Sequence, residues 1–263
     1  MQEIIFRKNV SKGSRFNQIY IPKHMENIVE IGDLVQVKLL KKHTFLQYKG
    51  LIQLSEFKEY LIKNIFSNLQ RFSEIEAIFI VGSFLFETLY NDIDVVLIIN
   101  NAKEGFEEKV KNDLEKEFSQ RFHILIFSDE KVRILIERDP LTRAMFTSYI
   151  ANKKAGWNYK KTVDNKHIEF LLMMPEDLLE LILPSKIYYD NIRRLITIEE
   201  FLKDKALDRE TILHQIKKEM EAKLLYKIRD NKGINDKEIN ILRGIIKEKI
   251  TRIRMLIKDG KKG

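Results

Sequence analysis

Apolar and polar positions change their spacing twice along the 263-residue chain, and this divides it into three zones. In the first zone, residues 1–48, the apolar residues form short β-branched or alternating runs at 4–6, 16–22 and 34–40. Turn-forming residues such as Gly32 and Asp33 separate these runs. Because short alternating runs between turns are typical of β-strands, the first zone is predicted to form a small β domain.

In the second zone, residues 52–174, helical and strand-like spacings alternate. Apolar residues between 55 and 72 recur at helical intervals after Ser55, which is a good N-cap residue. Apolar runs that predict strands follow at 75–81, 93–99 and 123–127, and a charged amphipathic stretch at 102–122 predicts a helix. This alternation predicts an α/β domain whose sheet contains strands of mixed sense.

The rest of the second zone predicts further elements. Residues 132–136 form a short apolar piece, and residues 140–152 predict a helix capped by Asp139. Two strand-like runs at 157–163 and 167–173 predict a hairpin that turns at Asp164 and Asn165.

The third zone, residues 175–263, has helical spacing throughout. Helices are predicted to begin at Pro175, Thr197, Asp208 and Asn235, and the third of them continues to residue 228 and ends by Gly233. Glu238 follows Asn235 at the spacing of a capping box. The complete prediction is an α+β protein in which a mixed sheet with flanking helices follows a small β domain and precedes a helical C-terminal region.

Composition excludes several classes of protein. The chain has no cysteine, which rules out disulfides, thiolate catalysis and cysteine zinc sites. No apolar run approaches 18 residues, and the first residues lack the long apolar block of a secretory signal, so we expect a cytoplasmic protein without a membrane span. Abundant Lys, Ile and Glu suit a thermophile, although AT-rich codon usage would produce the same bias.

The net charge of +8 is concentrated near the C-terminus. Residues 208–263 contain 16 Lys and Arg against 9 Asp and Glu, a net charge of +7. Four basic residues of the last predicted helix, at intervals of 4, 7 and 4, share one face: Arg243, Lys247, Arg254 and Lys258. We predict that this face binds nucleic acid, RNA more readily than DNA, and its alternative role is solubility.

The pattern that indicates chemistry lies between residues 78 and 100. Gly82 and Ser83 end one apolar run, and Asp92 and Asp94 open the next. Side chains two residues apart on a strand point to the same side, so the two carboxylates could bind Mg²⁺ or Mn²⁺ and serve as catalytic residues. Gly82 permits a tight turn, and Ser83 with its amide could bind the phosphates of a nucleoside triphosphate.

This arrangement resembles the polymerase-β-like nucleotidyltransferase superfamily over about residues 75–127. The resemblance rests on an apolar strand, Gly82 and Ser83, eight intervening residues, and then Asp92 and Asp94 at the start of a second strand. It implies a mixed sheet, two-metal catalysis, and transfer of a nucleoside monophosphate from an NTP to RNA or another acceptor. The superfamily also includes toxin-antitoxin nucleotidyltransferases, so that role stays open.

The chain departs from the family pattern where a third carboxylate is expected. Active members place this acid on a later strand beside the pair, and the corresponding run here, 121–127, contains no Asp or Glu. His123 is the one residue of ligand type in that run, but Mg²⁺ prefers oxygen ligands, so His123 is predicted to be a core residue. The segment after Ser83 is also apolar and a residue or more shorter than usual. A second hypothesis therefore keeps the fold without the chemistry, as a factor that binds nucleic acid or a ribonucleoprotein.

The first zone carries a separate resemblance. The runs 19–23 and 31–37, with a proline in the first and a Gly-Asp turn in the second, are similar to AbrB-like swapped-hairpin domains. Such domains dimerise and sometimes bind DNA. The resemblance implies a homodimer formed through the N-terminal β domain and leaves DNA binding open; a unit that only caps a neighbouring sheet is the alternative.

Overall fold

The structure is a computed structural model that describes residues 5–38, 45–100, 104–157, 160–230 and 232–259. The chain separates into two compact units, Met1–Lys42 and His43–Gly263, which we call the N-terminal unit and the larger unit. Residues 52–174 and 175–263, predicted as separate domains, both lie in the larger unit. None of the helices in the described residues is both long and apolar enough to cross a membrane.

The N-terminal unit contains one short hairpin. Strand β1 (Ser11–Lys12) pairs antiparallel with β2 (Asn17–Gln18), and the amide of Gly13 donates to the carbonyl of Phe16 at 2.9 Å across the turn. A 3₁₀ helix, η1 (Lys23–Met25), follows.

The longer strands predicted in the first zone are not present in the described residues. Within 16–22 only residues 17 and 18 are a strand, and residues 5–6 and 34–38 are not in strands; residues 4 and 39–40 lie outside the described residues. A long strand needs a partner for its backbone groups and a core for its apolar side chains. Met25 is the only large apolar side chain that is buried among residues 5–38.

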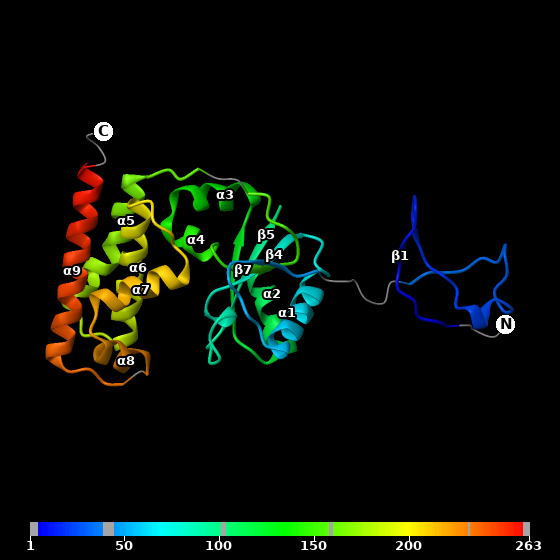
Figure 1. Ribbon diagram of the computed structural model, residues 1–263, viewed down its shortest axis with the longest axis horizontal. Helices are drawn as coiled ribbons and strands as arrows, with labels where there is room; N and C mark the ends of the chain where they lie inside the picture. Colours follow the sequence, from blue (N-terminus) through cyan, green and yellow to red (C-terminus); the bar gives the residue numbers. More distant parts are fainter. Residues whose placement is uncertain (1–4, 39–44, 101–103, 158–159, 231, 260–263) are drawn as a thin grey trace. The chain divides into compact units, whose positions relative to one another are not determined.

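The larger unit is built on a five-stranded sheet with the strand order β3-β7-β4-β5-β6 (Figure 1). The strands are Gln47–Lys49 (β3), Ile75–Val81 (β4), Ile93–Ile99 (β5), Phe122–Phe127 (β6) and Tyr149–Ala151 (β7). Because β5 pairs antiparallel with β4 and parallel with β6, the sheet is mixed, and the predicted α+β class is confirmed. The arrangement specific to nucleotidyltransferases stays a prediction.

Helices cover both faces of this sheet. Helices α1 (Glu56–Leu69) and α2 (Phe106–Phe118) pack on the face that carries the odd-numbered residues of β5. Helices α3 (Asp129–Arg138) and α4 (Pro140–Met145) pack on the face that carries the even-numbered residues of β5. Since side-chain direction alternates along a strand, Asp94 lies on the second face, next to the start of β5.

The described residues beyond 160 form a helical bundle with a continuous apolar core (Figure 1). Its helices are Asn165–Asp177 (α5), Ser185–Leu202 (α6), Arg209–Glu219 (α7), Ala222–Arg229 (α8) and Asp236–Asp259 (α9), with a 3₁₀ turn, η3, at Leu178–Glu180. The capping box at the start of α9 is confirmed, because the amide of Glu238 donates to Asn235 Oδ1 at 2.9 Å and the amide of Asn235 donates to Glu238 Oε2 at 3.0 Å.

The hairpin predicted across Asp164 is wrong, because the second of its strands is helix α5. The side chain of Asp164 accepts hydrogen bonds from the amides of Lys166 and His167, at 3.1 and 3.2 Å, and so caps this helix. Pro175, predicted to begin a helix, lies inside α5 near its end. Of the first predicted strand, residues 158–159 lie outside the described residues and the others are not in a strand.

Other predicted boundaries also differ from the structure. The 132–136 piece is part of α3, and the helix capped by Asp139 ends at residue 145, so that residues 149–151 join the sheet as β7. Thr197 lies inside α6, and the helix predicted over 208–228 is broken at Met220, where φ is −134° and ψ is 133°. The start of the helix predicted at 102–122 lies partly outside the described residues, and α2 begins at residue 106.

A buried ion-pair network joins α6, α7 and α9. The ammonium of Lys249 lies 2.6 Å from Glu199 Oε2 and 2.6 Å from Glu219 Oε1, and Lys203 reaches the other oxygen of Glu199 at 2.5 Å. Burial alone would raise the pKa of Glu199, but the hydrogen bonds and charges of Lys203 and Lys249 hold the pKa below its ordinary value of 4.5. The negative charge of the buried Glu199 carboxylate is therefore compensated by Lys203 and Lys249.

Lys249→Met is expected to lower the free energy of unfolding by about 3 kcal/mol, because it leaves Glu199 buried with one partner fewer. Since the folded pKa of Glu199 is depressed, its stabilising effect is fully present above pH 4.5 and is lost as the pH falls through the lower folded pKa. Urea denaturation at several pH values should therefore show the difference from wild type shrinking below pH 4.5. Lys247→Met, which changes an exposed lysine of the same helix, is the control and should alter stability by less than about 0.5 kcal/mol.

Candidate functional site

The turn after β4 is built around Gly82. This residue has φ 79° and ψ −161°, in the left-handed region that favours glycine, and a 3₁₀ helix, η2 (Ser83–Leu85), follows it. Val81 pairs with Asp94 across β4 and β5, and a Cβ added to Gly82 would collide with the Asp94 carboxylate. Glycine is therefore required at position 82 for two reasons: the backbone has a positive φ, and the Asp94 carboxylate lies where a Cβ would be.

Lys58 of α1 fastens the segment that follows Ser83. Its ammonium donates to the carbonyl of Phe84 and, at 2.6 Å, to the carbonyl of Glu87. It also lies 4.9 and 5.3 Å from the ring centroids of Phe84 and Tyr90. Burial lowers the pKa of Lys58, opposed by the charge of Glu87. The helical pattern of residues 55–72 marks Lys58 only as a polar position, so the sequence offered no signal for this role.

The acidic pair stands at the start of β5 as predicted from its spacing. Asp92 directly precedes the strand, Asp94 is its second residue, and both carboxylates are partly exposed. Burial raises the pKa of Asp94, and the charge of Asp92 raises it further. A hydrogen bond from His123 and the charges of His123 and Arg193 act in the opposite direction.

His123 stands where the family resemblance called for a third acid. The parallel pairing of β5 and β6 places it directly opposite Asp94, and its Nδ1 lies 3.0 Å from Asp94 Oδ1. Its side chain is 58% exposed, so the prediction that it is a core residue is wrong. The error has a physical reason: an apolar run predicts a strand, but only pairing with β5 decides which of its side chains lies beside the acids.

The acids that follow β6 do not complete the pair. Asp129 is bound by Arg133 Nε at 2.8 Å and by Trp157 Nε1 at 2.9 Å, and Glu130 is exposed on α3. Across the described residues, no three His, Asp or Glu side chains are grouped so that they could hold a metal ion together. Asp92 and Asp94 are therefore the candidate ligands, with His123 bound to one of them.

Three arginines of the bundle act on one tyrosine, and one of the three also acts on Asp94. Arg193 (α6), Arg209 (α7) and Arg229 (α8) all act on Tyr189, whose pKa is raised by burial against their combined charge. We call these four residues the arginine face. Arg193 is exposed and acts on Asp94 as well, which links the arginine face to the acidic pair.

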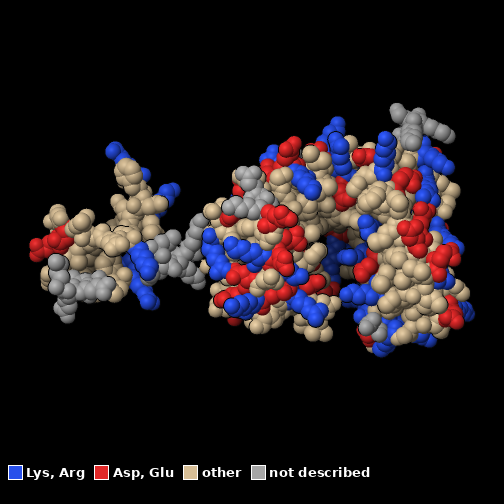
Figure 2. All heavy atoms as spheres, turned by 180° about the vertical axis from the view of Figure 1, so that it is seen from behind, with Lys and Arg blue, Asp and Glu red and all other residues tan. Residues whose placement is uncertain are grey.

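The segment after Ser83 also contacts this face directly. Arg209 forms an ion pair with Glu87, and its guanidinium lies 4.9 Å from the ring centroid of Phe86. Figure 2 shows the larger unit hollowed between its sheet and its helical bundle, with Lys and Arg side chains at the rim. The candidate site thus has an acidic side on the sheet and a basic side on the bundle.

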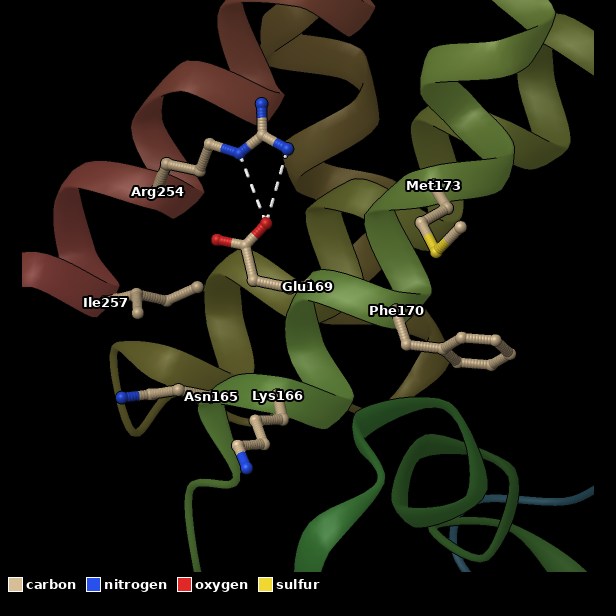
Figure 3. A pocket seen from close by; sticks show the side chains of 7 residues that line it. All are labelled: Asn165, Lys166, Glu169, Phe170, Met173, Arg254 and Ile257. Atoms are coloured by element: carbon tan, nitrogen blue, oxygen red, sulfur yellow. Dashed lines mark hydrogen bonds and ion pairs between the residues drawn. The ribbon is translucent and has the colours of Figure 1, made fainter.

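The predicted basic face of α9 is partly occupied by the protein itself. Arg243 donates to the carbonyl of Leu181 at 2.7 Å. Arg254 forms ion pairs with Glu176 at 2.5 Å and with Glu169 at 3.2 Å, and the second of these lies in the pocket between α5 and α9 drawn in Figure 3. Lys247 and Lys258 are exposed. Two of the four predicted nucleic-acid contacts therefore have structural partners, and binding by this face stays a prediction.

A comparison of the chain with protein-family models and with curated proteins finds no match. The case for the site consequently rests on its own geometry. That geometry sets the Asp94 carboxylate against Gly82, and it sets Asp92 near enough for its charge to act on Asp94. It adds His123, Lys58 and the arginine face, which sequence spacing did not reveal.

Gly82→Ala is expected to destabilise the protein by about 2 kcal/mol, because the new methyl group requires a strained φ and displaces the Asp94 carboxylate. Chemical denaturation followed by circular dichroism measures the change. Gly233→Ala is the matched control, since a Cβ there meets open space and its φ lies outside the left-handed region. Equal effects of the two substitutions would contradict the role given to Gly82.

Proposed function

We propose that the larger unit binds a nucleoside triphosphate with a divalent cation and transfers the nucleoside monophosphate to an RNA or another polyanionic acceptor. The observation that carries this proposal is the contact of the Asp94 carboxylate with the Gly82 backbone. That contact joins the phosphate-binding turn to the metal-binding acid, the two parts that such a reaction needs side by side. The resemblance to polymerase-β-like nucleotidyltransferases supports the same reading.

The acids present suit one cation. Asp92 and Asp94 present their carboxylates on the same side of β5, and Mg²⁺ is commonly bound by one or two carboxylates together with water and substrate phosphates. When bound, Mg²⁺ or Mn²⁺ would neutralise phosphate charge and polarise the phosphorus under attack. The second cation implied by the resemblance has no third carboxylate among the described residues.

The chain's own residues supply binding and orientation. Ser83, exposed beside Gly82, would bind the triphosphate, while Lys58 holds the following segment in place through two backbone carbonyls. The hydrogen bond from His123 fixes the orientation of the Asp94 carboxylate. These groups would seat the nucleotide without forming a covalent bond to it.

The arginine face is the part that we assign to the polyanion. Arg193 and Arg229 are exposed, and Arg193 lies within electrostatic reach of Asp94. Guanidinium groups bind phosphates in a bidentate manner, and an aromatic ring such as that of Tyr189 can stack on an unpaired base. An acceptor held there would have its end near the acidic pair.

One observation favours a second candidate function, in which the site binds but does not catalyse. The position that the resemblance gives to a third acid is occupied by His123, and imidazole is a poor ligand for Mg²⁺. In this alternative the protein is a binding factor for nucleic acid or a ribonucleoprotein, and the nucleotide site is a remnant.

Incubation with α-labelled nucleoside triphosphates, Mg²⁺ or Mn²⁺ and total RNA separates the two candidates. We expect the wild type to label RNA, and Asp92→Asn with Asp94→Asn to lower the rate at least about 100-fold, because the cation loses both charged ligands. The double variant should keep its RNA affinity. If the wild type binds RNA but transfers no nucleotide to it, the proposal of an enzyme is overturned and that of a binding factor is supported.

The variant His123→Asp tests whether position 123 belongs to the metal site. It restores a carboxylate opposite Asp94 and is expected to raise the affinity for Mg²⁺, measured by titration calorimetry in the presence of a non-hydrolysable triphosphate. His123→Asn, which keeps a hydrogen-bond donor without the charge, is the control. If the Asp variant binds Mg²⁺ no better than the Asn variant, the position is not part of the metal site.

The salt dependence of RNA binding tests the arginine face. Arg193→Gln with Arg229→Gln should flatten the slope of log affinity against log salt by roughly 1.4, because each phosphate contact on a single strand contributes roughly 0.7. Lys247→Gln with Lys258→Gln removes two exposed charges from α9 and is the matched control. If only the lysine variant changes the slope, the RNA is bound by α9 and not by the arginine face.

A further inference from the structure

Glu87 joins the segment after the Gly82 turn to the arginine face. Its carboxylate forms an ion pair with Arg209 of α7, and the guanidinium of Arg209 also lies 4.9 Å from the ring centroid of Phe86. Both partners of the ion pair are partly buried, since the side chains of Arg209 and Glu87 are 37% and 36% exposed. One of the three arginines of this face is therefore already bound by a carboxylate from outside the helical bundle.

The backbone of Glu87 is held independently of this ion pair. The amides of Phe86 and Glu87 donate to the carbonyl of Ser83, at 3.0 and 2.8 Å. On the other side, the ammonium of Lys58 donates to the carbonyl of Glu87 at 2.6 Å. The Glu87 carboxylate can therefore leave Arg209 by rotation of its own side chain, while the turn at Ser83 keeps its shape.

The other two arginines of the face are not bound in this way. Arg193 pairs with Asp190 of its own helix at 3.7 Å, and Arg229 is exposed. A phosphate that approaches the face would meet these two guanidinium groups directly. At Arg209 it would meet a guanidinium that a carboxylate occupies. Since carboxylate and phosphate bind a guanidinium in the same forked geometry, the two would compete for one position.

The internal ion pair is weak enough for a strand of nucleic acid to replace it. A partly exposed ion pair changes an equilibrium constant by roughly fivefold or less. A strand anchored on Arg193 and Arg229 would present a further phosphate to Arg209 at a high effective concentration, which a single free anion lacks. The face therefore favours a ligand with successive phosphates, and single-stranded RNA carries them in series along one backbone.

We propose that Glu87 is an internal mimic of an acceptor phosphate: its carboxylate occupies Arg209 in the free protein and is displaced when a strand of RNA binds the arginine face. The inference rests on the part of the proposed function that assigns this face to a polyanion, and it does not depend on catalysis. Glu87 sets a threshold for binding, because a ligand must engage Arg193 and Arg229 before it gains the third guanidinium.

A double-mutant cycle tests the displacement through the affinity of the full chain for a fluorescent single-stranded oligo(U). Glu87→Gln is expected to bind this RNA roughly fivefold more tightly than the wild type, because Arg209 is then free of its competitor. In the background of Arg209→Gln, the same substitution should change the affinity by less than about twofold, since no guanidinium is left to be freed. Fluorescence anisotropy at one fixed salt concentration measures all four proteins.

Glu210→Gln is the matched control. It removes the same charge from the residue next to Arg209, and Glu210 is exposed and forms no ion pair with any residue that the structure describes. Its effect should stay below about twofold, because salt screens exposed charges that are not in contact. If Glu87→Gln and Glu210→Gln act equally, or if the gain of Glu87→Gln persists without Arg209, the affinity reports net charge and the proposal is overturned.

Failure of this proposal and failure of the arginine face give different results. If Glu87→Gln brings no gain while Arg193→Gln with Arg229→Gln weakens binding, the face binds RNA but Glu87 does not compete with it. If neither variant changes the affinity, the arginine face is not where the RNA binds, and the acceptor site of the proposed function fails together with the role of Glu87.

Discussion

The contact between the Asp94 carboxylate and the α-carbon of Gly82 is the constraint on which the candidate site depends. It exists because β4 and β5 pair in a register that sets Val81 opposite Asp94. Any side chain at position 82 would separate the turn from the acid, and a shift of register by one residue would turn Asp94 to the other face of the sheet. The backbone that could bind phosphate and the carboxylate that could bind a cation are thus positioned by one pairing of strands.

Electrostatics then joins the sheet to the helical bundle. The segment after Gly82 is held from one side by Lys58 and from the other by the ion pair of Arg209 with Glu87. The charge of Arg193 acts on Asp94, so an anionic ligand at this point would meet the acidic pair and a guanidinium together. Elsewhere in the bundle, basic side chains form ion pairs within the protein. Lys249 is buried against two glutamates, and Arg254 bridges two more on α5. Basic composition alone therefore does not locate a binding surface.

The two units of the chain meet the requirements of folding in opposite ways. The larger unit has continuous apolar cores under its sheet and within its bundle, and its buried charges are paired. Among the described residues of the N-terminal unit, Met25 is the one large apolar side chain that is buried.

The sequence by itself determined what depends on neighbours along the chain. The capping box at Asn235 and the strands β4 and β5 follow from local spacing and were predicted correctly. Only the tertiary structure decided what depends on distant partners. His123 became part of the site through the parallel pairing of β6 with β5, and the predicted second strand of the hairpin became α5 because Asp164 caps it and the bundle buries one of its faces. Arg254, predicted to bind nucleic acid, forms ion pairs with two glutamates about 80 positions away, a distance that no periodic pattern spans.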